Sequence, residues 1–194
     1  MKKIFTTLAL VAFAATASAA TGFTTYDYDQ ANAGQGSFEA QHEVHVGAAV
    51  ATKFGAFDGA VVGSQLVTAS RDKGLGFELG YSKGLKLGTV AVTARAAYGR
   101  VNQLAVGGGG FTGNSQYYSL SAEAALPIAK NVTGFVGYRF RDGLNSNTPA
   151  VQNRFTAGVD FAVTKGVTLR AGYAFTKQAG YNMNGLTTAV TFAF

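Results

Sequence analysis

Apolar and polar residues alternate along most of the chain. From about residue 21 to the end, segments of roughly 8 to 14 residues keep a period of two, separated by turns rich in Gly, Asn, Asp and Lys. In one of them, Leu120, Ala122 and Ala124 share one parity, whereas Ser119 and Glu123 share the other. A period of two is the pattern of a β-strand with one apolar and one polar face. The chain is therefore predicted to be all-β.

The number of strands follows from counting these segments. Clear alternation covers residues 38–50, 75–81, 90–98, 117–126, 132–141, 154–163, 167–176 and 185–194. Two further segments are less clear, because 22–29 is short and the parity of 57–69 is ambiguous. The pattern predicts about ten strands, or about eight if the first segment and one weak segment do not pair.

Alternation alone does not distinguish a soluble β-sandwich from a membrane barrel, so the question is which face points inward. The polar parity carries charges of both signs together with glycines, which suits a crowded barrel interior. The apolar parity is aromatic near the strand ends and mostly Ala, Val and Leu between them, as in the aromatic girdles of outer-membrane barrels. The aromatic residues assigned to one rim are Tyr28, Phe38, Tyr98, Tyr118, Phe140, Phe155 and Phe175, and those assigned to the other are Phe54, Phe57, Tyr81, Phe161 and Phe194. The predicted fold is a closed antiparallel up-and-down transmembrane β-barrel.

The N-terminal sequence MKKIFTTLALVAFAATASAA has the three parts of a secretory signal peptide. Lys2 and Lys3 precede a short apolar run, and Ala17-Ser18-Ala19 matches a cleavage site. Residues 1–19 are predicted to be removed, leaving a barrel over 20–194, and the alternative is a retained N-terminal anchor helix. No other stretch approaches the roughly 20 apolar residues of a membrane-spanning helix.

Composition narrows the chemistry. The 194 residues include no cysteine, which excludes disulfides, thiolate catalysis and cysteine-based zinc sites. Lys and Arg number 16 against 10 Asp and Glu. For an exported chain this excess favours anionic lipid over nucleic acid as the partner.

Turn lengths also alternate. Short links are predicted at 53–55, 83–86, 127–131 and 164–166, and longer ones at 30–37, 101–115, 143–152 and 178–184, with 71–73 a short member of the second set. Each short link carries lysine, which serves either lipid-headgroup anchoring or ordinary solvation. Bacterial barrels have short periplasmic turns and longer external loops, so both termini are predicted to be periplasmic.

With these features the chain resembles the small outer-membrane β-barrel proteins of Gram-negative bacteria, the OmpA/OmpX-like and opacity-type families. In that family a terminal Phe, with apolar residues at alternate positions before it, is recognised by the barrel-assembly machinery. Phe194, Phe192, Val190 and Leu186 fit that signal, and Thr188 is its weak position. The resemblance implies a cell outer-membrane location and contact with outer-membrane lipids including lipopolysaccharide. No peptidoglycan-binding domain is expected, and a monomer is favoured.

Charged residues on the polar parity are expected to pair inside the barrel. Across the turn 164–166, Asp160 should face Arg170 and form an ion pair. Glu123 and Arg95 should lie at a similar height on neighbouring strands, with Glu78 close by. Such a set would pair charges that are costly to bury one at a time. Three further arginines are expected to make the outer mouth of the lumen basic: Arg139, Arg141 and Arg154.

Catalysis is the least supported function. His45 shares the inward parity with Glu43 and Glu39, whereas His42 points outward. No nucleophile motif lies beside them, and one His with two Glu lacks a fourth metal ligand. No catalytic residue, metal site or cofactor is therefore expected. The sequence favours a non-enzymatic barrel serving envelope structure or surface interaction, with a low-conductance porin as the alternative and an envelope lipase or protease as the third reading.

Deletion of Phe194 is expected to impair assembly more than stability. The amount of folded protein in outer-membrane fractions, measured by heat-modifiable gel mobility, should fall several-fold. The free energy of unfolding of the refolded variant should change by no more than about 0.5 kcal/mol, because one exposed terminal residue is lost. A deletion variant that reaches the outer membrane at normal levels would contradict the assembly role.

Overall fold

A computed structural model describes residues 20–32, 40–67, 73–104, 111–145, 151–178 and 181–194. They form ten strands in chain order, and the predicted signal peptide lies outside the described residues. The strands are β1 (Ala20–Ala31), β2 (Ala40–Thr52), β3 (Gly55–Val67), β4 (Lys73–Leu87), β5 (Val90–Leu104), β6 (Phe111–Ala129), β7 (Val132–Gly143), β8 (Gln152–Thr164), β9 (Val167–Gln178) and β10 (Tyr181–Ala193). The described part of the chain holds no helix long and apolar enough to cross a membrane.

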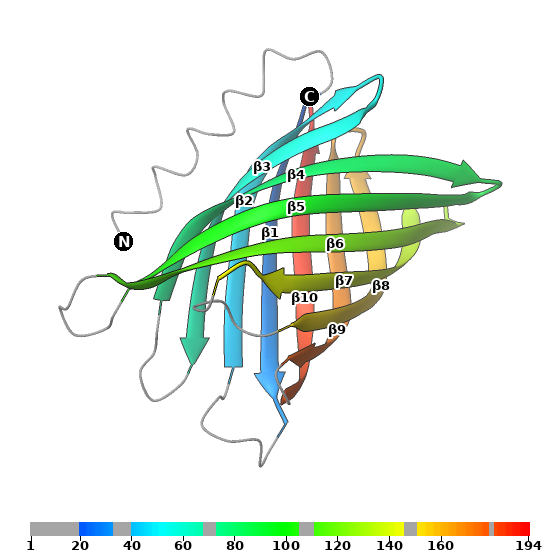
Figure 1. Cartoon of the computed structure of the whole chain (residues 1–194). Coiled ribbons are helices and arrows are strands. Elements are labelled where there is room, and N and C mark those ends of the chain that lie inside the picture. The colour runs from blue at the N-terminus through cyan, green and yellow to red at the C-terminus, as the bar shows by residue number, and fades with distance from the viewer. Residues whose placement is uncertain (1–19, 33–39, 68–72, 105–110, 146–150, 179–180) are drawn as a thin grey trace.

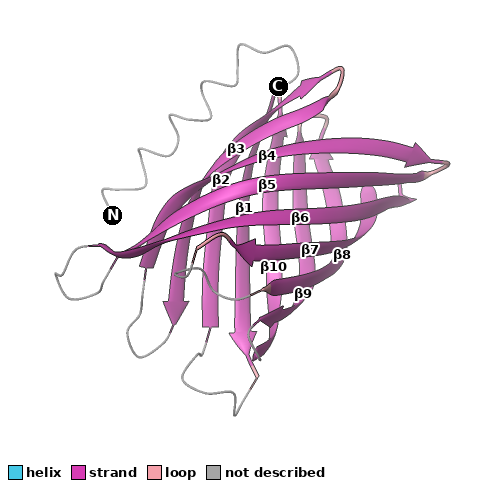
Figure 2. Cartoon of the chain, in the orientation of Figure 1, coloured by secondary structure: helices cyan, strands magenta, loops and turns pink. Residues whose placement is uncertain are grey.

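The strands close into a barrel (Figure 1). Each strand pairs antiparallel with its neighbours in the sequence, and β1 also pairs with β10, from Thr21 opposite Ala193 to Ala31 opposite Met183. Strand dominates the described chain (Figure 2). The prediction of about ten strands in an up-and-down barrel is confirmed, and the short segment 22–29 is part of the closing strand.

The barrel has two distinct ends. The turn end carries the β2–β3, β4–β5, β6–β7 and β8–β9 connections, together with Ala20 and Phe194, which are joined by a backbone hydrogen bond of 3.0 Å. The loop end carries the other five connections, of which residues 33–39, 68–72, 105–110, 146–150 and 179–180 lie outside the described residues.

Several predicted links are wrong in position or length. Strands extend into two of them, so the link expected at 101–115 contains only residues 105–110 and that expected at 127–131 only residues 130–131. The turn expected at 83–86 lies instead at Gly88-Thr89, because Lys83 and Lys86 still pair with Ala94 and Ala91 of β5. Gly88 has a φ of 64°, the left-handed backbone that glycine adopts without strain, so it marks the turn better than the lysines do. The link expected at 178–184 contains only residues 179–180 between β9 and β10.

Apolar side chains cover the outside of the barrel, as the alternation predicted. Leu79 is 57% exposed and Val136 60%, whereas the inward Glu78 is 4% exposed. The described part of the ambiguous segment 57–69 also alternates, with Phe57 outside and Asp58 inside, but its inward face includes the apolar Val62, which made the parity unclear. One closed sheet with an apolar exterior is the reverse of a soluble sandwich.

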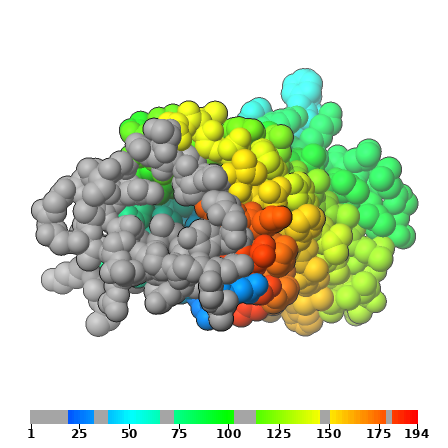
Figure 3. Space-filling model, turned by 60° about the horizontal axis from the view of Figure 1, so that its bottom comes forward, coloured from blue at the N-terminus to red at the C-terminus, as the bar shows by residue number. Residues whose placement is uncertain are grey.

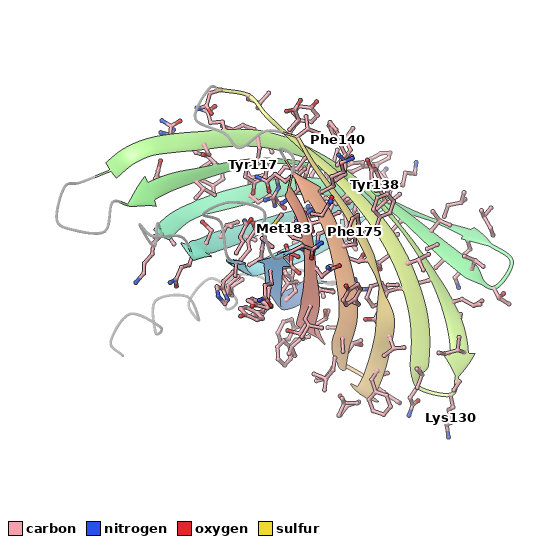
Figure 4. The ribbon with its side chains drawn as sticks, turned by 90° about the horizontal axis from the view of Figure 1, so that it is seen from below. Tyr117, Lys130, Tyr138, Phe140, Phe175 and Met183 are labelled. Atoms are coloured by element: carbon pink, nitrogen blue, oxygen red, sulfur yellow. The ribbon has the colours of Figure 1, made fainter. Side chains whose placement is uncertain are left out.

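Aromatic residues border the apolar band at both ends. Near the turn end, Phe57 and Tyr81 stack with ring centroids 5.1 Å apart. Near the loop end, Tyr138 (Figure 4) lies opposite Phe155. Its hydroxyl donates to Oδ1 of Asn153 at 2.6 Å, and Asn153 lies two residues nearer the loop end than Phe155. The other outward tyrosines with hydroxyl bonds to polar side chains there are Tyr26, Tyr28, Tyr98, Tyr118 and Tyr173. Such rings have their apolar body against the band and their polar tip beyond it.

Gly99→Ala is expected to destabilise the barrel, because a Cβ at Gly99 would overlap the ring of Tyr117 at Cζ. Tyr117 is only 3% exposed and cannot move aside without breaking its contacts. The free energy of unfolding of the refolded protein should fall by about 1–3 kcal/mol. Gly63→Ala is the matched control, since a Cβ there meets nothing within 4 Å. Equal stability of the two variants would show that the interior is loosely packed.

Candidate functional site

The charged interior of the barrel is the candidate functional site. Its inward-facing charges form four clusters, each built around one arginine and named by it. The Arg170 cluster is Glu123, Asp160 and Arg170; the Arg95 cluster is Asp58, Glu78 and Arg95; the Arg141 cluster is Glu43, His45, Tyr117 and Arg141; the Arg154 cluster is Asp27, Asp29 and Arg154.

The Arg170 cluster contains the predicted hairpin pair. Asp160 lies directly opposite Arg170, and its Oδ1 accepts from Nε at 2.7 Å. Both terminal nitrogens of Arg170 also donate to Glu123, at 2.7 and 2.8 Å. The guanidinium lies 4.0 Å from the centre of the Phe135 ring. Arg170 is thus held by two carboxylates and one aromatic face, an arrangement that suits a planar guanidinium.

The Arg95 cluster includes a residue that the sequence did not reveal. Arg95 donates to Asp58 and contacts Glu78 Oε1 at 2.8 Å. Asp58 was missed because the parity of 57–69 was ambiguous. The expected set of five charges is therefore divided in two: Arg95 faces Ser121 across β5 and β6, and Glu123 reaches Arg170 instead.

The Arg141 cluster fills the middle of the barrel. Arg141 donates twice to Glu43, at 3.0 and 2.9 Å, and lies 4.3 Å from the Tyr117 ring centre. The Tyr117 hydroxyl donates to Glu78 at 2.9 Å, which links this cluster to the Arg95 cluster. His45 Nε2 lies 2.5 Å from Glu43. Glu43, His45 and Tyr117 are buried, so this centre is packed with paired polar groups.

The Arg154 cluster lies beside Arg139, which faces Arg154 across β7 and β8. Arg154 contacts Asp29 and donates to Asp27 at 3.1 Å, and its side chain is 3% exposed. The two aspartates belong to β1, which the sequence indicated only as a short segment. The arginines expected to form a basic mouth are therefore mostly neutralised within the barrel: Arg141 and Arg154 bind carboxylates, and Arg139 lies 3.9 Å from Asp27.

The predicted inward pair of His45 and Glu43 is present, whereas Glu39 lies outside the described residues. His42 faces outward as expected, with its Nδ1 2.7 Å from the Tyr26 hydroxyl. Across the described ranges, no group of three or more His, Cys, Asp or Glu is arranged to hold a metal ion. Glu43 is also bound by Arg141, so His45 and Glu43 belong to the packed charge network.

Two cavities lined by described residues lie between the clusters. The larger, about 730 Å³, occupies the turn-end half, where Thr21, Thr168 and Thr191 line it close to the strand ends. The smaller, about 160 Å³, lies beside it. They share Asp27, Arg139, Arg170 and Thr187. The interior is therefore hollow and polar toward the turns and packed toward the loops. Around it, β7 to β10 form a continuous wall in the space-filling view (Figure 3).

The fold is similar to known translocator barrels of autotransporters. The translocator domain of autotransporter NalP from Neisseria meningitidis aligns with a TM-score of 0.53 and 12% identity, over 98% of this chain and 95% of that chain. The β domain of the Bordetella autotransporter BrkA aligns with a TM-score of 0.56 and 16% identity, over 91% and 98%. At this identity the likeness establishes the fold alone.

Comparison of the sequence itself found no match to a protein-family model and none to a curated protein. The fold is that of outer-membrane β-barrels.

Arg154→Met is expected to lower the free energy of unfolding by about 3–5 kcal/mol, because Asp29 would be left buried without its ion-pair partner and Asp27 would keep only Arg139, 3.9 Å away. Arg170→Met should cost less, since Arg170 is 28% exposed and its partner Glu123 is 32% exposed, so water can solvate the carboxylates left behind. Denaturant unfolding of both refolded variants measures the difference. Equal losses would mean that burial does not set the strength of these pairs.

Proposed function

We propose that the chain is an integral outer-membrane β-barrel protein whose charge-paired interior keeps it closed, and that it serves envelope structure or surface interaction. The exposed apolar band, bordered by aromatic residues, carries the membrane assignment. Exposed Leu79, Leu120 and Val136 would be unfavourable in water and favourable against lipid. In this proposal the chain is not an enzyme.

The orientation follows the bacterial rule that short connections face the periplasm. The turn end, with both described chain ends, is then periplasmic, and the loop end meets lipopolysaccharide at the cell surface. Residues 1–19 would be removed on export. Phe192 and Phe194, which are 39% and 62% exposed on the outer wall, are available to the assembly machinery.

Closure is supported by the Arg141 and Arg154 clusters. Their side chains come from strands around the barrel and cross the lumen, as in Arg141 on β7 binding Glu43 on β2. Opening a path would separate charges that are satisfied only by one another. These ion pairs therefore favour a barrel that is closed at rest.

A low-conductance porin is the second proposal, and the 730 Å³ cavity favours it. The cavity is lined by threonines and charged groups, so water and small solutes could occupy half of the lumen. Only the packed layer on the loop side would then have to open. Such a channel would be narrow and sensitive to the charges of that layer.

Planar-bilayer recordings of the refolded protein distinguish the two. The closed barrel is expected to give no reproducible channels, and replacing both Glu43 and Arg141 by Ala should create them by removing one ion pair from the packed layer. Arg100→Gln is the control, because Arg100 lies opposite the exposed Phe77 on the outward parity. Wild-type channels whose conductance changes with Glu123→Gln or Arg139→Gln would establish the porin and overturn the closed barrel.

A further inference from the structure

Arg139 differs from the other inward arginines in how few of its donors are used. Arg154 and Arg170 each bind two carboxylates, and Arg141 makes two bonds to Glu43. Arg139 donates one hydrogen bond, from Nη2 to Gln152 at 3.3 Å. Its nearest carboxylate, Asp27, is 3.9 Å away, which is too far for a hydrogen bond.

The Nε of Arg139, like the Nε of Arg100 and of Arg141, is buried without a hydrogen-bond partner in the described part of the chain. A guanidinium offers five N–H donors, and a buried donor without a partner costs about 1–3 kcal/mol. A side chain on β7 with most of its donors unused is therefore poised to bind an acceptor. The acceptor must be small enough to reach the space beside it.

That space is the 160 Å³ cavity, which Arg139 lines together with three hydroxyl residues, Ser121, Thr156 and Thr187. Arg154 and Arg170 also line it, but each is already paired with two carboxylates, so Arg139 is the lining arginine whose donors are mostly unused. The unused donors of Arg139 and the neighbouring hydroxyl groups suit a small anion. The volume corresponds to about five waters at roughly 30 Å³ each, which limits the anion to a few heavy atoms.

The cavity is reached from the turn end. Arg139 and Arg170 line both cavities, and the larger cavity extends to Thr168 and Thr191 near the strand ends. A small solute that enters there can reach Arg139 without crossing the ion pair of Glu43 and Arg141, which lines neither cavity. In a closed barrel the site would be open only toward the turn end, so binding there requires no path through the barrel.

We propose that Arg139 binds a small oxyanion, of the size of inorganic phosphate, that enters from the turn end. The two terminal nitrogens of Arg139, of which only Nη2 donates a hydrogen bond to a described residue, present coplanar donors of the kind that phosphate and carboxylate oxygens accept. Ser121, Thr156 and Thr187 supply further donors around it. Asp27 and Glu123 limit the charge that the site tolerates, which favours a small anion over a polyanion.

The test is calorimetric titration of the refolded protein, in micelles of an uncharged detergent, with inorganic phosphate at constant ionic strength. Wild-type protein is expected to bind phosphate saturably. Arg139→Gln should weaken binding at least about tenfold, because charge-assisted hydrogen bonds are lost. Arg100→Gln is the matched control: it removes the same charge from the outward face and should bind as wild type.

Three results would overturn the proposal: no saturable binding by wild type, equal binding by Arg139→Gln, or equal loss with Arg100→Gln. Competition by inositol hexakisphosphate as effective as phosphate itself would also overturn it, since that polyanion is too large for the cavity. Heat-modifiable mobility verifies that each variant is folded. If Arg139→Gln does not refold, Arg139→Lys replaces it, because lysine keeps the charge but loses the paired donors. Phosphate binding by this variant should weaken several-fold. Unchanged binding would refute the site.

Discussion

The hydrogen-bonded seam between β1 and β10 is the interaction on which the rest of the structure depends. It joins the first and last strands over eleven paired positions, from Thr21 to Ala31. Without it the sheet would have two free edges, each with unpaired backbone groups that an apolar surrounding cannot satisfy. Closure also creates an enclosed interior. Only then do side chains from distant strands meet across a lumen.

The enclosed interior imposes a second constraint, which is that its charges must be paired. Seven inward carboxylates and five inward arginines take part in the described ion pairs: Asp27, Asp29, Glu43, Asp58, Glu78, Glu123 and Asp160 with Arg95, Arg139, Arg141, Arg154 and Arg170. Glycines make room for the largest of these side chains, as Gly80 does beneath Arg95. Arg139 is the exception to close pairing, since its nearest carboxylate, Asp27, lies 3.9 Å away. The cavities adjoin Arg139 and Arg170, whereas Glu43 and Arg141 line neither of them.

Local relationships were predictable from the sequence, because a hairpin fixes its own register. Asp160 and Arg170 are ten residues apart, and the turn between them places them face to face. Long-range pairs were not predictable in this way. Arg141 and Glu43 are 98 residues apart, and neither residue type nor spacing indicates that they meet. Asp27, Asp29 and Asp58 were missed because their segments were short or ambiguous in parity.

The sequence by itself therefore determined the strands, their inward and outward faces, and the aromatic borders, since a period of two and side-chain polarity are local properties. Only the tertiary structure decided which charges face one another. Closure and the stagger of the strands set the height of each inward side chain, and both depend on all ten registers together. For the same physical reason, the small cavity beside Arg139 exists only in the closed barrel.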